Sequence, residues 1–387
     1  MIRTRSLLDV ADVETTSVSP DALERNTAYL GLENLARLGG ITRFSTVGQA
    51  DLASSKFVFT SEHVLLGKLR PLLRKVAYPG RRGVCSTDIY PLRPGPALDG
   101  GYLYHFLRTP GVGAWLSQRA TGANLPRVSR SVLKDLAIPI VPLEDQRRIA
   151  ALLDQVDELR AKRRRTLALL EDLRAARLQQ FLERSKCSEV PFGSFISDLR
   201  YGSSSKAADH GSLVMRIPNV QRGALWLDEM KRVPLSSDET GTFALLEGDL
   251  LMVRSNGSPD LIGRAAAFTS TRIAGTPLAS ESVVFASYLL RVRLSPRALP
   301  AYVEAVLASS PLRRSIRAIA RTSAGQYNLN GPAVRNLPIP LPPLADQQQV
   351  VAELETISAA EADHRTHLTK LDELFASLQH RAFTGRL

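Results

Sequence analysis

Side chains that can bind nucleic acid gather in a few short stretches of the sequence. Arginine and lysine neutralise phosphates, while arginine, asparagine and glutamine can form paired hydrogen bonds to base edges. Several of these stretches are flanked by glycine, which favours flexible loops. The alternative interpretation is a solvated basic surface. We select as candidate DNA-binding residues Lys68, Arg70, Arg74, Lys75, Arg81, Arg82, Asn124, Arg127, Arg130, Arg254, Asn256, Arg264, Gln326, Tyr327 and Asn328.

Residues suited to catalysis or metal binding are sparse. His364 and His367 share one face of a predicted helix and could hold a metal ion. They have no third ligand clustered beside them, so the alternative of seam or surface histidines is favoured. The two cysteines, Cys85 and Cys187, exclude a disulfide framework and a cysteine-rich zinc site. We therefore expect no catalytic residue and no metal in this chain.

Length and charge narrow the class of protein. A chain of 387 residues exceeds one typical hydrophobic core, so two or more domains are expected. A net charge of +12 makes nucleic acid the first partner to test. The N-terminus lacks the apolar segment of a secretion signal, and no run of 18 apolar residues is present. We expect a cytoplasmic protein.

The chain contains one internal repeat. Residues 133–146 read LKDLAIPIVPLEDQ, and residues 334–347 read VRNLPIPLPPLADQ. The two segments are offset by 201 residues, and seven of their fourteen positions are identical without a gap. Such a match indicates two copies of one structural unit.

A long segment without proline or glycine follows each copy, at residues 145–182 and 346–383. Apolar residues recur in both at seven-residue steps, which is typical of a helix with one apolar stripe. A helix of about 38 residues is about 57 Å long, too long to bury its stripe in a small domain. We therefore predict that the two helices pack on each other as a coiled coil. Arg163 and His364 occupy the same step of the stripe and are expected to fix its register or make room for a partner.

These segments divide the chain into four parts. We predict a first domain at 1–142, a first helix at 143–184, a second domain at 185–343 and a second helix at 344–387. The positive charge belongs to the domains, whose net charges are +7 and +6, against +2 and −3 for the helices. The basic run at 162–165 is interpreted as helix surface, facing solvent or an acidic partner, rather than as a DNA arm.

Both domains are predicted to be of mixed α/β class. Short apolar runs of strand length alternate with turn sequences such as Pro79-Gly80 and Asn256-Gly257. Strands are predicted at 56–59, 64–69, 250–253 and 282–292, and helices at 102–108 and 301–317.

The order of these segments resembles that of a known family. The pattern L-x-I-P-x-x-P-L-x-D-Q followed by a long charged helix occurs twice. The first domain contains YLGLEN at 29–34 and LLGKLRP at 65–71, the second contains IPNV at 217–220 and GDLL at 248–251, and the chain ends in LQHRAFTGRL. Together these segments resemble the DNA-specificity subunit of a type I restriction-modification system.

The resemblance implies a function and a set of partners. Members of this family carry two target-recognition domains, each of which reads one half of a split, asymmetric site in double-stranded DNA. Their two long helices pack antiparallel, act as a ruler between the domains and dock two methyltransferase subunits. Translocating restriction subunits complete the phage-defence complex. S-adenosylmethionine and ATP with magnesium are expected in those partners, not in this chain.

The resemblance also implies a non-catalytic subunit. An adenine methyltransferase would carry an Asn/Asp-Pro-Pro-aromatic motif, and the nearest string, LPPL at 341–344, lacks the polar residue. A translocase would need the GxxxxGK[ST] phosphate loop, which the sequence lacks. A self-contained enzyme is therefore disfavoured. The alternative left open is a specificity-like DNA-binding protein of an orphan methylation system or of another phage-defence assembly.

Overall fold

The computed structural model describes residues 3–221, 223–323 and 325–387. The chain divides into two units, one of residues 1–165 with 364–387 and one of residues 166–363. Each unit contains one domain together with part of each long helix. No helix in the described part of the chain is both long and apolar enough to cross a membrane.

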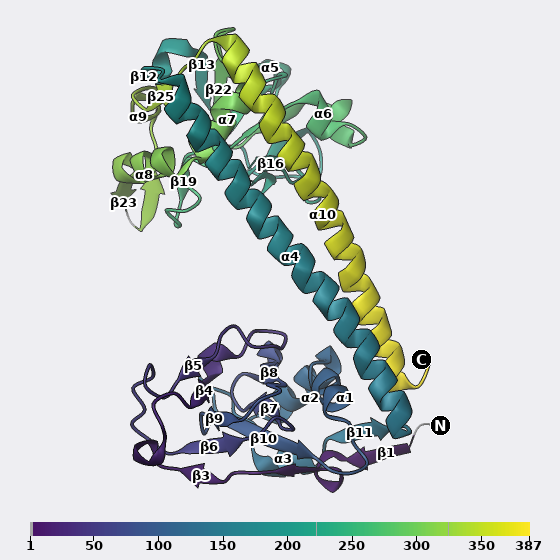
Figure 1. Ribbon diagram of the computed structural model, residues 1–387. Coiled ribbons are helices and arrows are strands. Elements are labelled where there is room, and N and C mark those ends of the chain that lie inside the picture. Colours follow the sequence, from purple (N-terminus) through teal and green to yellow (C-terminus); the bar gives the residue numbers. More distant parts are fainter. Residues whose placement is uncertain (1–2, 222, 324) are drawn as a thin grey trace. The chain divides into compact units, whose positions relative to one another are not determined.

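The first domain contains two main sheets. The strand order of one is β2-β10-β7-β8, and that of the other is β3-β6-β9-β4-β5, in which β4 and β9 run parallel. Figure 1 shows β3, β4, β6 and β9 on one side of this domain and α1 and α2 on the other. The elements are β1 (Arg3–Ser6), β2 (Ala11–Val13), β3 (Ser17–Val18), β4 (Ala28–Leu30), β5 (Ser45–Thr46), β6 (Lys56–Phe59), β7 (Val64–Gly67), β8 (Val76–Ala77), β9 (Gly83–Cys85), β10 (Ile89–Pro94), α1 (Gly100–Leu107), α2 (Pro110–Arg119), α3 (Arg130–Lys134), β11 (Ala137–Ile140) and α4 (Leu143–Ser185).

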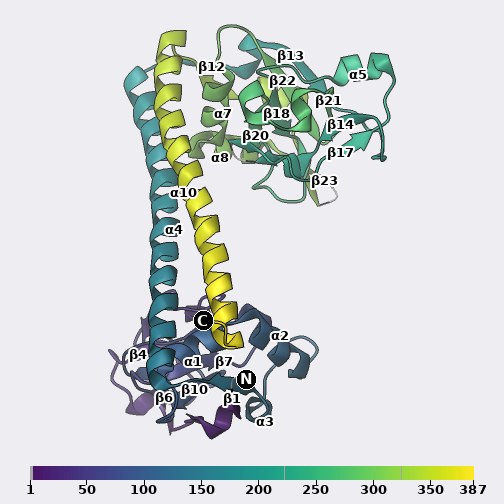
Figure 2. The same ribbon diagram turned by 90° about the vertical axis from the view of Figure 1, so that its right-hand side faces the viewer.

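The second domain repeats this plan with additions. The order β13-β22-β18-β20 matches the first four-stranded sheet, and β14 and β21 form a parallel pair as β4 and β9 do. Figure 2 shows α7 and α8 on one side of the domain and β14, β17 and α5 on the other. The elements are β12 (Glu189–Pro191), β13 (Ile196–Tyr201), β14 (Ser212–Met215), β15 (Val220–Gln221), β16 (Ala224–Leu225), β17 (Lys231–Val233), α5 (Ser237–Phe243), β18 (Leu250–Val253), β19 (Ser255–Asn256), β20 (Ala265–Ala267), α6 (Ser270–Ile273), β21 (Val283–Phe285), β22 (Leu289–Leu294), α7 (Pro300–Ala308), α8 (Ser310–Ile319), β23 (Arg321–Ser323), β24 (Gln326–Asn328), α9 (Gly331–Arg335), β25 (Pro338–Pro340) and α10 (Leu344–Thr384).

The repeated L-x-I-P-x-x-P-L-x-D-Q segment forms a strand and the start of a long helix in each unit. Its glutamine is fully buried in both copies. Gln146 accepts a hydrogen bond from the backbone of Asp99 at 2.9 Å and donates two, to the carbonyls of Ala97 and Val141 at 3.0 and 2.8 Å. Gln347 makes the same three bonds at nearly the same distances. A buried amide whose donors and acceptor are paired in this way ties the first turn of the helix to the domain.

A buried tyrosine completes the junction. The hydroxyl of Tyr102 in α1 donates to the carbonyl of Pro139 in β11 at 3.0 Å, and that of Tyr302 in α7 donates to Pro340 in β25 at 2.8 Å. Burial raises the pKa of both tyrosines. The prolines suit β11 and β25 because each of these strands pairs with a single neighbour, so a missing N–H leaves no ladder incomplete.

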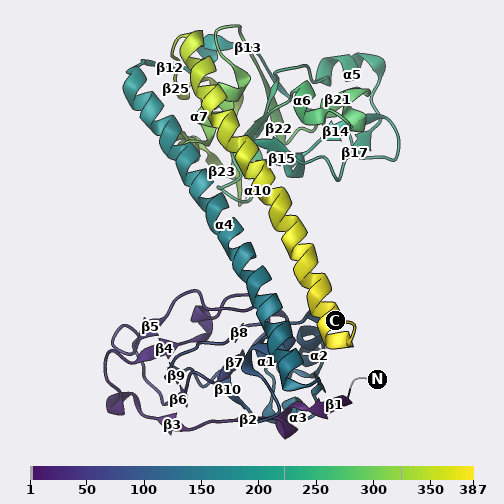
Figure 3. The same cartoon turned by 45° about the vertical axis from the view of Figure 1, so that its right-hand side comes forward.

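Parts of α4 and α10 run antiparallel in each unit, and Figure 3 follows both helices. In the first unit, Ile149, Leu153 and Val156 of α4 share a core with Phe375 and Ala382 of α10. In the second unit, Leu178 of α4 packs with α10 residues at the start of that helix, Val350, Val351 and Leu354. The predicted fold class, two repeated α/β domains with long coiled-coil helices, is confirmed.

Polar contacts accompany these seams. In the first unit Arg160 of α4 binds Asp372 at 2.5 Å and lies 4.4 Å from the ring centroid of Phe375. Arg163 donates a hydrogen bond to Nδ1 of His364 at 2.7 Å, so these two predicted seam residues do meet. That they fix the register remains a prediction.

Two predicted elements were wrong in extent. The helix expected at 301–317 is broken at Ser309, whose backbone is extended, because Pro311 in the first turn of α8 lacks the N–H that a continuous helix would use. The strand expected at 282–292 is two strands, β21 and β22, separated by a turn in which Leu289 donates to the carbonyl of Ala286 at 2.9 Å.

Candidate nucleic-acid interface

Two loops of the first domain meet beside the end of β7. Leu69 and Thr121 each form a β-bridge with Arg127. The backbone N–H of Arg70 donates to Pro126 at 2.9 Å, and that of Val128 donates to Lys68 at 2.9 Å. The candidates Lys68, Arg70, Asn124 and Arg127 therefore lie on two adjoining loops, the first-domain loop edge (residues 68–70 and 121–130).

The second domain brings its candidates together in the same way. Its second-domain loop edge (residues 254–258 and 321–328, without 324) is built on a three-stranded sheet of order β19-β24-β23. Asn256 pairs with Tyr327 across two strands, and Leu329 donates to the carbonyl of Arg254 at 2.8 Å. That last bond matches the one between Val128 and Lys68, because 329 and 128 differ by the repeat offset.

One cation occupies the same place in both edges. Lys68 donates to the carbonyl of Thr87 and lies 4.1 Å from the ring centroid of Tyr90. Arg254 donates to the carbonyl of Ser287 and lies 4.7 Å from the ring centroid of Tyr201. Burial lowers the pKa of Lys68. Each cation is thus held in a defined direction at the base of its edge.

Several other candidates are engaged inside the domains. Arg74 donates to the carbonyl of Arg108 at 3.0 Å, and burial lowers its pKa. Lys75 donates to the carbonyl of Leu32. Arg264 donates to the side-chain oxygen of Gln221 at 3.0 Å. These bonds stabilise the loops, so a DNA contact by these three side chains would have to share or replace them.

The remaining candidates are Arg81, Arg82 and Arg130 in the first domain and Gln326 and Asn328 in the second. Arg81 and Arg82 are exposed on the turn between β8 and β9, outside the first-domain loop edge, and Arg81 lies 4.9 Å from the ring centroid of Phe44. Arg130 is exposed at the first residue of α3. Gln326 accepts a hydrogen bond from Ser255 at 3.3 Å, and Asn328 pairs with Ser255 across β19 and β24. As DNA contacts, all of the candidates remain predictions.

Sequence reasoning missed a group of arginines on α8. Arg313, Arg314 and Arg317 line a cavity together with the candidate Arg264. Arg317 lies four residues after Arg313 and three after Arg314, and these spacings were a usable signal because they bring side chains together on a helix surface. The expected uninterrupted helix at 301–317 concealed that this side belongs to the start of a separate helix.

Among the residues that the structure describes, no three histidine, cysteine or acidic side chains gather to hold a metal ion. The two histidines considered from the sequence, His364 and His367, lie on α10.

Known proteins similar to this chain are specificity subunits of type I restriction enzymes. Residues 4–171 match a family described as the type I restriction modification DNA specificity domain. The chain is 27% identical over 319 residues to the EcoKI specificity subunit of Escherichia coli K12, covering 76% of this chain and 67% of the relative. It is 25% identical, with the same coverage, to the StySPI specificity subunit of Salmonella potsdam.

Two solved structures share the fold. The type I restriction-modification S subunit from M. genitalium has a TM-score of 0.62 at 13% identity and covers 99% of this chain and 96% of its own. A chain from a study of complex assembly and conformational transition of the type I R-M system has a TM-score of 0.54 at 18% identity, covering 100% and 98%.

Proposed function

We propose that the chain is a type I restriction-modification specificity subunit, as its similarity to that family suggests, and that it selects the DNA sequence on which a methylation and restriction complex acts. Each domain reads one half of a two-part, asymmetric site through its loop edge. The chemistry is carried out by other subunits, which hold S-adenosylmethionine and ATP with magnesium.

The repeated loop edge is the observation that supports this proposal. Both domains place two loops side by side, with a ring-stacked cation at the base, on a common framework of strands. The side chains beyond that cation differ, since Asn124 and Arg127 stand in the first edge where Gln326, Tyr327 and Asn328 stand in the second. Equal frameworks with unequal side chains suit two half-sites of different sequence.

The long helices offer a surface for partner subunits. Leu152 and Leu159 of α4 are 38% and 49% exposed in the first unit, and Leu169 and Leu173 are 62% and 52% exposed in the second. Exposed leucines on a helix whose opposite face is already packed favour a further helical partner. We therefore assign this face to docking of the methyltransferase subunits, from which the restriction subunits are recruited.

The test is to map methylated adenines in DNA after incubation with the protein, its methyltransferase partner and S-adenosylmethionine. We expect two short unlike half-sites at a fixed separation. Exchange of residues 1–142 for the first domain of another specificity subunit is the matched control and should change one half-site only. A continuous symmetric site, or methylation by the purified chain alone, would contradict the proposal.

A further inference from the structure

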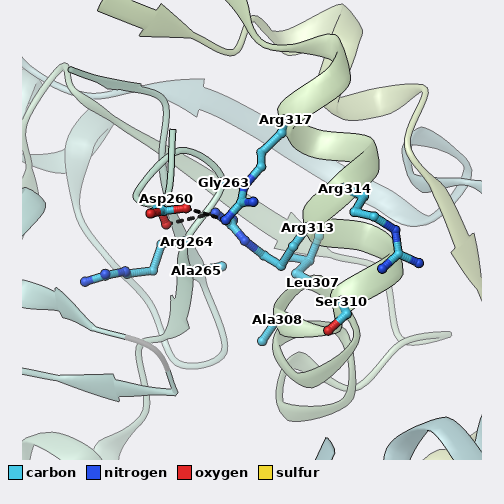
Figure 4. A pocket seen from close by; sticks show the side chains of 10 residues that line it. All are labelled: Asp260, Gly263, Arg264, Ala265, Leu307, Ala308, Ser310, Arg313, Arg314 and Arg317. Atoms are coloured by element: carbon cyan, nitrogen blue, oxygen red, sulfur yellow. Dashed lines mark hydrogen bonds and ion pairs between the residues drawn. The ribbon is translucent and has the colours of Figure 1, made fainter. Parts of the chain in front are cut away.

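A cavity of about 480 Å³ lies against the start of α8 in the second domain. Its lining includes Arg264, Arg313, Arg314, Arg317, Asp260 and the first residue of α8, Ser310. Figure 4 shows Arg313 and Arg317 of α8 pointing toward the loop that carries Asp260, and Arg314 on the other side of the helix. We call this the arginine cavity.

The walls of the arginine cavity are held in place by the protein itself. Arg313 donates to the backbone carbonyls of Ile262 and Asp260 at 2.6 and 2.9 Å. Gly263 has a φ of +70°, and a Cβ at that residue would lie 2.5 Å from Cγ2 of Ile316. Glycine therefore lets the loop lie directly on α8. Arg313 is a fixed part of the wall and not an adaptable arm.

The charges in the cavity favour an anion. Four arginines and a single carboxylate line the cavity, and of these Arg313 and Arg317 point toward Asp260 (Figure 4). The N-terminal end of the ten-residue α8 adds its positive dipole end. The carboxylate of Asp260 pairs with Arg317, but both side chains are substantially exposed, at 71% and 49%. Because exposed ion pairs contribute little, an incoming phosphate can replace Asp260 as the partner of Arg317 at small cost. The planar donor fork of arginine matches phosphate oxygens.

The cavity adjoins the second-domain loop edge. Asn256 accepts a hydrogen bond from the backbone of Ser258 at 2.8 Å, and the hydroxyl of Ser258 accepts one from the backbone of Asp260 at 3.3 Å. A single short loop therefore carries a candidate base-reading amide at one end and the cavity wall at the other. Helix α8 also leads directly into β23 of the same edge.

We propose that the arginine cavity binds a backbone phosphate of the DNA half-site read by the second domain. This inference rests on the proposed function and adds a named positioning contact to it. The first domain lacks the contact, because the equivalent places on α2 are held by Gly113, Ala114 and Ser117. A phosphate contact fixes register on the duplex without reading sequence, so its effect should be the same for any duplex.

The experiment measures binding of the full-length protein to a fluorescent DNA duplex over a range of salt concentrations. The double variant R314Q/R317Q keeps Arg313 and so keeps the wall. We expect its affinity at about 0.1 M salt to fall roughly tenfold, and the slope of log Kobs against log salt to decrease by about one for each phosphate that the protein no longer neutralises. The matched control R147Q/R148Q removes two exposed charges at the start of α4 and should keep the wild-type slope.

Two single variants guard against a folding defect. D260N removes the competing carboxylate while its backbone carbonyl still binds Arg313, so it should bind DNA more tightly than wild type. R317K keeps the charge but loses the fork, and it should keep the slope with a smaller loss of affinity. A wild-type slope in R314Q/R317Q, or weaker binding by D260N, would overturn the inference.

The outcome is distinguishable from failure of the proposed function. If the wild-type protein has no affinity for duplex DNA, the proposed function itself fails. If inorganic phosphate raises the Tm of wild type but not of R314Q/R317Q while DNA binding by both is equal, the cavity takes a free ion and the assignment to DNA is wrong.

Discussion

Helices α2 and α8 occupy equivalent places in the two domains and show how the repeat has diverged. Both begin after an extended residue, Thr109 or Ser309, and both bury their first apolar residue in the core. In the first domain the next residue, Gly113, lies so close to Arg74 that an added Cβ would be 2.9 Å from Cγ of that arginine. In the second domain the next residue is Arg313 itself.

The comparison separates framework from surface. The 3₁₀ turn Pro71–Leu73 packs on α2, whereas the loop around Gly263 packs on α8, so the exposed sides of the two helices face different surroundings. The buried glutamines and tyrosines remain paired alike in both domains. The hydrogen-bonded glutamine and tyrosine at each domain–helix junction are therefore the same in both domains, whereas the exposed side chains of α2 and α8 differ.

The largest expected effect tests the shared framework. Q146L and Q347L each remove three buried hydrogen bonds and leave backbone groups unpaired, so each should cost about 3 kcal/mol of stability in its own domain. Hydrogen–deuterium exchange of peptides covering 96–103 and 296–303 is the measurement. Each variant should accelerate exchange in its own peptide, and Q379L, which removes a single bond to His105, is the milder control. Unchanged exchange in either glutamine variant would show that Gln146 and Gln347 do not play the same structural role in the two domains.

A smaller effect should distinguish the domains. Burial opposes ionisation of Asp198, but the hydrogen bond and charge of the buried Arg291 hold the pKa of that carboxyl below its usual value. The stabilisation is therefore complete above the unfolded-state pKa of about 4 and disappears as pH falls through the lowered pKa. D198N should destabilise the second domain at neutral pH by about 2 kcal/mol.

The matched control for that acid response is D12N. Strand pairing places Asp12 beside Arg93 as it places Asp198 beside Arg293, but Asp12 is exposed. Urea denaturation, followed by exchange in each domain at neutral pH and near pH 3, is the measurement. An equal loss of stability in D198N and D12N would show that the two carboxylates stabilise their domains to the same extent, contrary to this prediction.

The smallest expected effect concerns the buried tyrosines. Y102F and Y302F each delete one hydroxyl and its bond to a proline carbonyl, and each should cost about 1 kcal/mol. Thermal denaturation of the two variants and of the double variant is sufficient to measure this. Unequal costs would show that the two junctions are packed differently despite their matching bonds.

Much of this architecture was predictable because it depends on patterns that the sequence repeats. The seven-residue pattern placed Arg163 and His364 at the same step of the helix stripe, and in the structure the two side chains are hydrogen-bonded. The directions of Arg74 and Lys75 were not predictable, because they turn inward toward carbonyls of residues far along the chain. The arginine cavity was missed for the same reason, since its second wall comes from a loop some fifty residues before α8.

The buried glutamine at each domain–helix junction sets the rotational phase of the long helix. Three hydrogen bonds prevent the first turn from rotating about its axis independently of the domain. One residue inserted after Gln146 would turn every later side chain of α4 by about 100° around that axis. The glutamine thus determines which direction each later side chain of the helix faces relative to the domain.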